Sequence, residues 1–179
     1  ELKIKKENFI NFKKDFLSKN MENSIINEMW SIVNSENISK KIVLDLFDGV
    51  ESDLEDRVVI KSKKELLVYS YRVAGTVGLM MSKILQVKDK EAMKGAIDLG
   101  IAMQLTNIAR DVIEDGKSNR KYIDSKFSSI QETIKQSQIF YDKSFNLISK
   151  IHLSSRFLVI VARGACTKMG DYIIKKKNK

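Results

Sequence analysis

Apolar residues recur at helical spacing along nearly the whole chain, and short polar segments interrupt them. In the first of these segments Phe9, Phe12 and Phe16 lie three and four residues apart, which places them on one face of a helix. The β-branched residues form short runs without strict alternation, so a sheet is not expected. The pattern predicts helices over residues 7–19, 21–34, 38–55, 63–85, 89–115, 127–149 and 154–175. We therefore expect an all-α fold.

The helix predicted over residues 63–85 has a clear start and an apolar composition. Ser62 precedes it as a candidate N-cap, and Glu65 follows at the spacing of a capping box. Because this helix is apolar on most sides, it should lie at the centre of the fold. Gly75 and Gly78 lie inside it, although each glycine costs a helix about 1 kcal/mol relative to alanine. They make sense where a ligand or a neighbouring helix must come close.

Composition supports one domain over residues 1–179 and narrows the choice of partners. The chain has no proline and eight glycines, so long helices can form without interruption. Its net charge of +9 indicates either an anionic partner (nucleic acid, phosphate or an acidic membrane) or a solvated lysine-rich surface. We expect no nucleic-acid binding, because basic and aromatic residues are not interleaved and no reading helix is recognisable. The single Cys166 excludes an internal disulfide, and no apolar run approaches the roughly 20 residues of a membrane span.

A polar stripe follows the apolar part of the helix predicted over residues 89–115. Asn107, Asp111 and Asp115 are each four residues apart, and Gln104 lies about one turn before them, so the four share nearly one face. Mg²⁺ prefers oxygen ligands and commonly takes one or two carboxylates together with substrate phosphates. The stripe therefore fits half of a magnesium site.

Basic residues accompany this stripe. Arg110, Arg120 and Lys121 could neutralise the oxygens of a diphosphate, and an arginine can bind them in a forked geometry. The alternative is a solvated helix end with intrahelical pairs such as Arg110 with Glu114. The apolar segment AIDLGIAMQL before the stripe favours the first interpretation, since its burial would hold the acids at a cleft.

Two longer segments, YSYRVAGTVGLMM and AIDLGIAMQLTNIARDVIEDGKSNRKYI, resemble the squalene and phytoene synthase family of head-to-head prenyltransferases. The first contains a tyrosine followed by VAGxVG, and the second contains Asp-x-x-x-Asp and then Arg-x-Tyr, in the family's order. Weaker similarity covers LFDGVESDLEDR and SSRFLVIVARGACTKMGDYI, so the resemblance extends over nearly the whole chain. It implies an all-α isoprenoid-synthase fold, a helical bundle around a central cavity.

The resemblance also implies an activity and a cofactor. Within the family the chain is most similar to the bacterial phytoene synthases, which join two geranylgeranyl diphosphates head to head. The expected product is phytoene, made through prephytoene diphosphate in carotenoid biosynthesis. The alternatives are a squalene or dehydrosqualene synthase acting on farnesyl diphosphate, and a non-catalytic relative that serves as an assembly scaffold. The implied cofactor is Mg²⁺, or Mn²⁺ in its place, and NADPH is not expected.

The resemblance further assigns roles to particular residues. The metal ligands that it implies are Asn107, Asp111 and Asp115. The residues that it places near the substrate diphosphates are Gln104, Arg110 and Arg120. The catalytic positions that it implies are Tyr69, Arg110, Arg120 and Tyr122. The positions that it places beside the prenyl chain are Val73, Ala74, Gly75 and Gly78.

Part of the family pattern is absent from the chain. The family's first aspartate-rich motif should precede residue 1, because FINFKKDFLSKN resembles the segment that follows it. We therefore expect the C-terminal part of the fold, without its N-terminal helices and inactive alone. The acidic cluster before residue 57 is no substitute, because the resemblance places it at a separate Gly-x-x-x-Asp motif, with Gly49 and Asp53 matching. Cys166 stands at a usual tyrosine position and His152 at a usual proline.

The composition and the basic chain end predict where the protein works. A bias toward lysine, asparagine and isoleucine indicates an AT-rich bacterial genome, and we expect a cytoplasmic monomer. The end of the chain, IIKKKNK, predicts peripheral contact with an anionic inner membrane, into which prenyl substrates and products partition.

Overall fold

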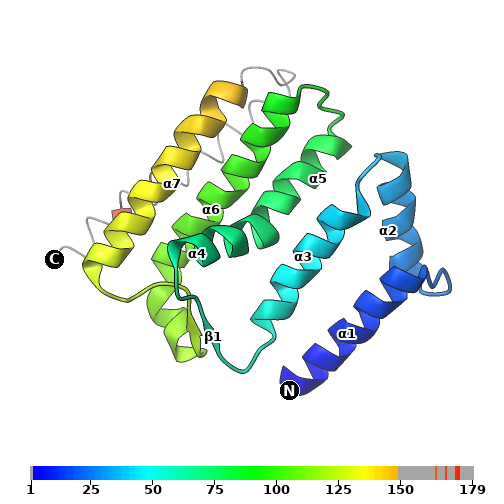
Figure 1. The fold of residues 1–179 in the computed structure, drawn as a ribbon, viewed down its shortest axis with the longest axis horizontal. Coiled ribbons are helices and arrows are strands. Elements are labelled where there is room, and N and C mark those ends of the chain that lie inside the picture. Colours follow the sequence, from blue (N-terminus) through cyan, green and yellow to red (C-terminus); the bar gives the residue numbers. More distant parts are fainter. Residues whose placement is uncertain (1, 149–163, 165–167, 169–171, 174–179) are drawn as a thin grey trace.

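The computed structural model describes residues 2–148, 164, 168, 172 and 173 of the chain. Between residues 2 and 148 the regular elements are helices, apart from two strands of two residues each, which confirms the all-α prediction (Figure 1). The elements are α1 Leu2–Ser18, α2 Ser24–Ser35, α3 Lys40–Asp53, β1 Val58–Val59, α4 Lys63–Ser70, η1 Tyr71–Gly75, α5 Thr76–Ile84, α6 Lys90–Lys117, β2 Arg120–Lys121 and α7 Phe127–Ile148. The helix predicted over residues 154–175 falls largely outside the described residues, as do Cys166 and His152. The prediction that the chain is the C-terminal part of a larger domain stays a prediction.

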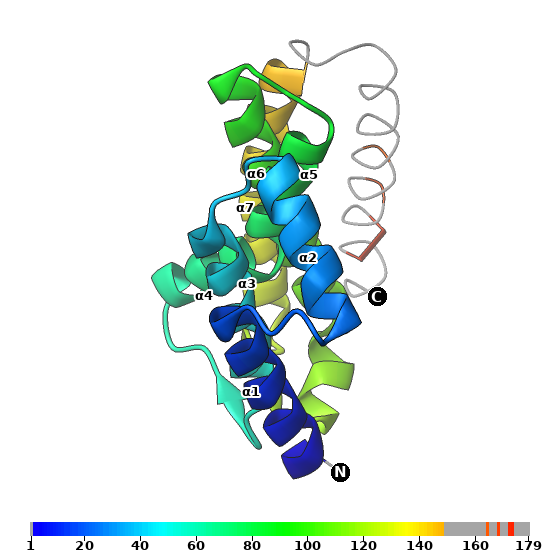
Figure 2. The same cartoon turned by 90° about the vertical axis from the view of Figure 1, so that its right-hand side faces the viewer.

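The helices are arranged as a layer with α1 and α2 at one edge. Figure 1 shows α3, α5, α6 and α7 side by side, and α6 packs against both α5 and α7. Figure 2, turned by 90°, shows α1 and α2 in front of the rest of the molecule. This order makes α6 an inner helix with neighbours on two sides.

Separate apolar clusters hold the two parts of this layer. In the cluster of α1, α2 and α3, Phe16 stacks on Trp30 with 4.9 Å between ring centroids, and Phe47 meets Phe16 edge-on. The clusters around α6 bring together residues of α4, α6 and α7, with Leu105 and Ile134 almost fully buried. The second group of clusters surrounds the helix that carries the polar stripe.

The segment predicted as one helix over residues 63–85 has three parts. α4 and α5 are α-helical, and η1 between them is a π-helix, whose turn holds one residue more than an α-helical turn. The predicted cap is present, because the Ser62 hydroxyl accepts a hydrogen bond from the Glu65 amide at 3.1 Å. The Glu65 carboxylate accepts from the Lys61 amide at 2.8 Å, one residue before the position of a standard capping box.

A short parallel pairing connects two loops of the structure. β1 pairs with β2 in the register Val58 to Arg120, and the Val58 amide donates to the Asn119 carbonyl at 3.0 Å. The two strands have only two residues each, too few for a sequence pattern to predict. The pairing ties the connection after α3 to the connection after α6, where the predicted site residues Arg120 and Tyr122 lie.

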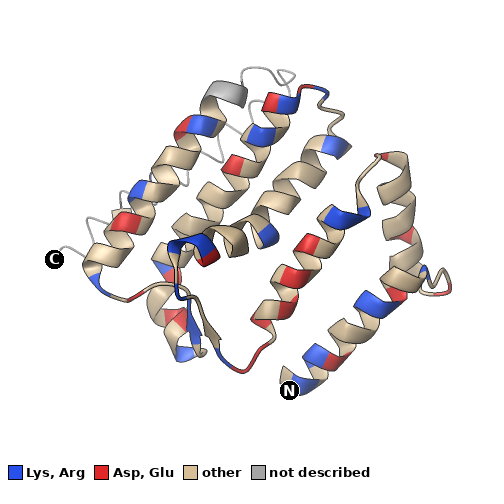
Figure 3. Cartoon of the chain, viewed as in Figure 1, with Lys and Arg blue, Asp and Glu red and all other residues tan. Residues whose placement is uncertain are grey.

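Charged residues of α1 and α3 face each other across the edge of the layer. In the cartoon of Figure 3, acidic residues recur along α3, and α1 beside it carries basic and acidic residues. Lys13 donates to Asp48 at 2.9 Å and to Glu51 at 2.6 Å, so the acidic segment of α3 is engaged in ion pairs with a neighbouring helix. No helix in the described part of the chain is long and apolar enough to cross a membrane.

Candidate functional site

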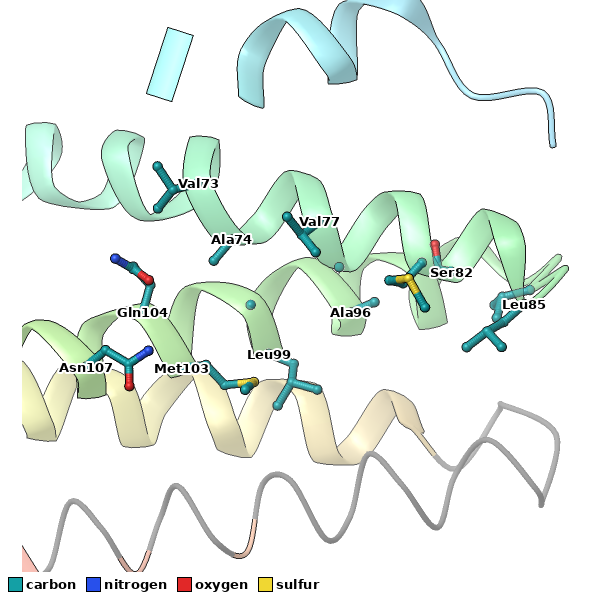
Figure 4. A pocket seen from close by; sticks show the side chains of 14 residues that line it. Val73, Ala74, Val77, Ser82, Leu85, Ala96, Leu99, Met103, Gln104 and Asn107 are labelled. Atoms are coloured by element: carbon teal, nitrogen blue, oxygen red, sulfur yellow. The ribbon is translucent and has the colours of Figure 1, made fainter. Parts of the chain in front are cut away.

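An apolar groove of about 350 Å³ lies between α5 and α6. Four of the predicted substrate residues line it, namely Val73, Ala74, Gly78 and Gln104, and so does the predicted metal ligand Asn107. Figure 4 shows Gln104 and Asn107 at one end of the groove and Leu85 at the other. The groove is therefore polar at one end and apolar along the rest of its length, which suits an amphipathic ligand with an elongated apolar chain.

Glycines allow α5 and α6 to approach closely beside this groove. A β-carbon at Gly78 would overlap the carbonyl oxygen of Ala96, and one at Gly100 would overlap the carbonyl oxygen of Ala74. Gly75 does not line the groove, because it is buried and a β-carbon there would meet the side chains of Tyr71 and Ile97. The structure thus places Gly78 at the groove and Gly75 in helix packing.

The polar stripe runs along α6 from the groove toward the end of the helix. All four of its members lie within Lys90–Lys117 and are partly exposed. Arg110 forms a forked pair with its neighbour Asp111, with Nε and Nη2 each 2.6 Å from one carboxylate oxygen. The sequence suggests Glu114 as an intrahelical partner of Arg110. In the structure the arginine pairs with Asp111, a predicted metal ligand.

Asp115 lies in the most negative part of the stripe. Burial raises the pKa of its carboxyl, and the charges of Asp111, Asp53 and Glu114 raise it further, while Arg120 acts in the opposite direction. A bound cation would relieve this repulsion, so the stripe is suited to one. Among the described residues, however, no group of three or more His, Cys, Asp or Glu side chains is close enough to hold a metal ion by itself. Asn107, Asp111 and Asp115 remain predicted metal ligands, and a metal held there would need further ligands from substrate, water or other residues.

Tyr69 and Tyr122, the two tyrosines predicted as catalytic, both hydrogen-bond to Asp53 beside the stripe. The resemblance implies no role for Asp53. Tyr69 donates to Oδ2 of Asp53 and Tyr122 donates to Oδ1, both at 2.8 Å. Their rings stack with 4.8 Å between centroids, and their hydroxyl oxygens are 3.2 Å apart. Burial is the main cause that raises the pKa of both phenols, and the charge of Asp53 adds to it. Both phenols therefore stay protonated at neutral pH.

Arg120 is held by the backbone at the end of α3. Its Nη2 donates to the carbonyl oxygen of Asp53 at 2.6 Å, and its Nη1 donates to the carbonyl oxygen of Glu55 at 3.0 Å. Arg120 and Tyr122 also border a small hollow together with Asp115. The structure brings Tyr69, Tyr122, Arg120 and Asp115 together, whereas Arg110 points to Asp111 on the exposed side of α6.

Two residues that shape this region received no functional assignment from the sequence. Asp53 has the spacing Gly49-x-x-x-Asp53 as its only local signal, and nothing in that spacing reveals that two distant tyrosines bind it. Gly100 lies in an apolar segment of α6. The sequence feature that could have indicated its role is a glycine inside a predicted helix. A helix normally disfavours glycine, so its presence can indicate close backbone contact.

Comparison with known proteins places this geometry in a family. The family model for squalene/phytoene synthase matches residues 11–143, a range that includes the groove, the tyrosines and the whole polar stripe. The 15-cis-phytoene synthase of Paracoccus sp. is 46% identical over 80 residues, which are 45% of this chain and 26% of that enzyme. Across the first four relatives the chain spans between 20% and 29% of the relative's own length.

Solved structures with the same arrangement of helices agree in fold. The squalene synthase of Alicyclobacillus acidocaldarius has a TM-score of 0.81 at 14% identity, over 94% of this chain and 73% of that one. A dehydrosqualene synthase crystallised with a ligand has a TM-score of 0.79 at 24% identity, over 94% of this chain and 68% of that one. Since the family model covers most of the chain and includes both resembling segments, the chain belongs to the squalene/phytoene synthase family.

Proposed function

We propose that this chain acts in the head-to-head condensation of two geranylgeranyl diphosphates to phytoene, through prephytoene diphosphate, in carotenoid biosynthesis. The observation that carries the proposal is the groove between α5 and α6, which is apolar along its length and ends at the amide and carboxylate stripe of α6. A prenyl diphosphate has the same division into a long apolar chain and an anionic head. The similarity to a 15-cis-phytoene synthase favours a geranylgeranyl chain over the farnesyl chain of squalene and dehydrosqualene synthases.

Asn107, Asp111 and Asp115 are the residues that would hold Mg²⁺ or Mn²⁺. When bound, the metal supplies positive charge that stabilises the departing diphosphate. Gln104 lies at the polar end of the groove, where its amide can orient the head of the substrate. The apolar walls of the groove, among them Val77 and Leu99, offer a reactive allylic cation no nucleophilic side chain. NADPH is not needed, because phytoene formation includes no reduction.

The direct test is turnover of geranylgeranyl diphosphate with Mg²⁺ by the protein as its gene encodes it. We expect phytoene as the product, and we expect Asp111→Ala and Asp115→Ala each to lower turnover by at least about 100-fold, since each removes a charged ligand. Asp124→Ala is the matched control, because Asp124 is an exposed carboxylate paired with Lys121 outside the stripe. Full turnover by either stripe variant would defeat the site assignment.

Product analysis separates the alternatives. Dehydrosqualene or squalene from farnesyl diphosphate would replace the phytoene assignment with the shorter-chain one. No product from any prenyl diphosphate, by a protein that is folded and binds Mg²⁺, would favour the non-catalytic scaffold.

We further infer a cytoplasmic monomer that contacts the inner membrane peripherally through the basic segment at residues 173–179. The support is the chemistry of that segment, which combines two isoleucines with four lysines, and the low solubility of prenyl products in water. Sedimentation with anionic vesicles should be reduced by deletion of residues 175–179, and unchanged sedimentation would count against this inference.

A further inference from the structure

Asp53 is the residue at which three chain segments meet beside the polar stripe, namely α3, α4 and β2 with the loop that follows it. It is the last residue of α3, and its carboxylate accepts hydrogen bonds from Tyr69 of α4 and Tyr122 of the loop after β2. Its carbonyl oxygen accepts a third hydrogen bond, from Arg120 of β2. Its charge also raises the pKa of Asp115 at the end of α6, so the carboxylate lies near the stripe itself.

The hydrogen bonds fix where the two phenol protons lie. Each tyrosine has one hydroxyl proton, and the shorter contact of each hydroxyl, at 2.8 Å, is with a separate oxygen of Asp53. Hydrogen bonds to a charged acceptor are stronger than those between neutral groups. Tyr69 also has the geometry of a donor to the Tyr122 hydroxyl, at 3.2 Å, but its single proton goes to the nearer and charged acceptor. Both protons therefore point at the carboxylate.

This arrangement determines what the tyrosines can offer to a ligand. With their protons committed to Asp53, Tyr69 and Tyr122 retain only lone pairs for any other partner. Two phenol oxygens side by side, next to a carboxylate, create a negative potential that favours positive charge. The same arrangement makes either tyrosine a poor proton donor to a leaving diphosphate.

The surrounding structure keeps the cluster in this state. Tyr69 is 8% exposed, and its ring stacks on that of Tyr122. Arg120 and the β1–β2 pairing hold the loop of Tyr122 against the end of α3. The tyrosines are therefore held in this orientation without a ligand.

We propose that Asp53 is a positioning residue for the condensation, which orients Tyr69 and Tyr122 as hydrogen-bond acceptors toward the positive charge of the reacting groups. The proposal rests on the proposed function, since it concerns the same reaction. Asp53 acts on the substrate through the tyrosines and does not need to touch it.

The test is Asp53→Asn, which keeps the size of the side chain but replaces one acceptor oxygen with an NH₂ donor. One tyrosine must then accept from the amide and turn its own proton elsewhere. We expect kcat for geranylgeranyl diphosphate with Mg²⁺ to fall between about 10-fold and 100-fold, as for loss of one charge-assisted hydrogen bond. Calorimetry with a non-hydrolysable thiolodiphosphate analogue should give wild-type stoichiometry and affinity within about 3-fold, which would exclude loss of folded protein as the cause.

The matched control is Asp45→Asn on the same helix. Asp45 also accepts a hydrogen bond from a tyrosine, Tyr71, at 3.3 Å, and it pairs with Lys41. It lies two turns before Asp53, outside the cluster, so its variant should keep wild-type kcat.

A second comparison shows whether Asp53 acts through the tyrosines. In the variant Tyr69→Phe/Tyr122→Phe, adding Asp53→Asn should lower kcat by less than about 3-fold, because the groups that Asp53 orients are already gone. A full additional loss in that background, or wild-type kcat for Asp53→Asn alone, would overturn the proposal and leave the proposed function standing. Absence of turnover by the wild-type protein would instead defeat the proposed function itself.

Discussion

Asp115 differs from Asp111, the other acid of the α6 stripe, because it is surrounded mainly by like charge. Among the described residues, Asp111 has Arg110 as a close partner, whereas Asp115 lies near Asp53, Asp111 and Glu114, and the charge of Arg120 opposes theirs. Helical periodicity predicts that Asp111 and Asp115 share a face, since both lie on one helix. It does not predict Asp53, which is more than fifty residues away in sequence and reaches the stripe only through tertiary contacts. The shared face of the α6 stripe could be predicted from the sequence, because its residues lie on one helix. The contact of Asp53 with Tyr69 and Tyr122 could not, because it joins distant segments.

The raised pKa of Asp115 predicts a pH dependence of stability. An acid whose pKa is higher in the folded than in the unfolded protein destabilises the fold once it is ionised. The loss of folding free energy is therefore present at neutral pH. It disappears as the pH falls below about 3.8, the ordinary pKa of an aspartate. Asp115→Asn should therefore raise the free energy of unfolding at pH 7 by up to about 1 kcal/mol without metal. Urea denaturation between pH 3.5 and about pH 7 measures this difference, which should shrink toward the acid end.

Asp124 provides a comparison, because the pKa of its carboxyl is shifted in the opposite direction from that of Asp115. Its hydrogen bond with Lys121 lowers the pKa of its carboxyl, so ionised Asp124 stabilises the folded state above the ordinary pKa. Asp124→Asn should reduce stability slightly at pH 7 and have no effect in acid. If both variants shifted stability in the same direction, the charge environment assigned to Asp115 would be wrong.

At the scale of elements, the helices that could be predicted are those whose signals are local. The capping serine at residue 62 is adjacent in sequence to the helix that it begins, and the prediction of its hydrogen bond is confirmed. The division of residues 63–85 into α4, η1 and α5 was not predicted, because a segment apolar on most sides has no sharp periodicity in which one extra residue would be visible. The β1–β2 pairing was missed because two residues cannot show alternation.

The crossing of α5 and α6 predicts a large effect of a small substitution. Gly100→Ala places a methyl group against the backbone carbonyl of Ala74, which cannot move aside as a side chain could. We expect a loss of about 1–3 kcal/mol in the free energy of unfolding, measured by chemical denaturation. Gly116→Ala in the same helix meets no atom within 4 Å and should stabilise by up to about 1 kcal/mol. Equal effects of the two substitutions would contradict the close approach of the helices.

At the scale of the whole molecule, α1, α2 and α3 share one apolar cluster, against which Met80 of α5 packs, whereas α4, α6 and α7 contribute to others. The absence of proline and the helical periodicity predict an all-α chain, and the resembling segments predict its family. Which helices lie next to each other could not be predicted from periodicity, because every amphipathic helix has an apolar face that fits several partners. The ion pairs between α1 and α3 are likewise visible only in the folded structure.

Lys13 provides a test of the attachment of α1. Its hydrogen bonds with Glu51 and Asp48 raise the pKa of its amine, so the stabilisation is present at neutral pH and is lost above about 10.5 as the amine deprotonates. Lys13→Gln should lower the free energy of unfolding by about 0.5–1 kcal/mol, and the loss should shrink in 1 M salt. Lys14→Gln, at the exposed neighbouring position, should change stability by less than about 0.5 kcal/mol. A loss for Lys13→Gln that is independent of salt would argue against an electrostatic attachment.

The extra residue in η1 sets the rotation of everything that follows it in the helix. Removing one residue from Tyr71–Gly75 would turn α5 by about 100° relative to α4, because each residue of an α-helix advances by that angle. Val77, Gly78 and Met81 would then leave the groove, although circular dichroism would still report the same helical content. Binding of an apolar fluorescent probe should be lost in that variant. Insertions and deletions in this short stretch are therefore expected to be among the least tolerated length changes in the protein, despite lying inside a continuous helical segment.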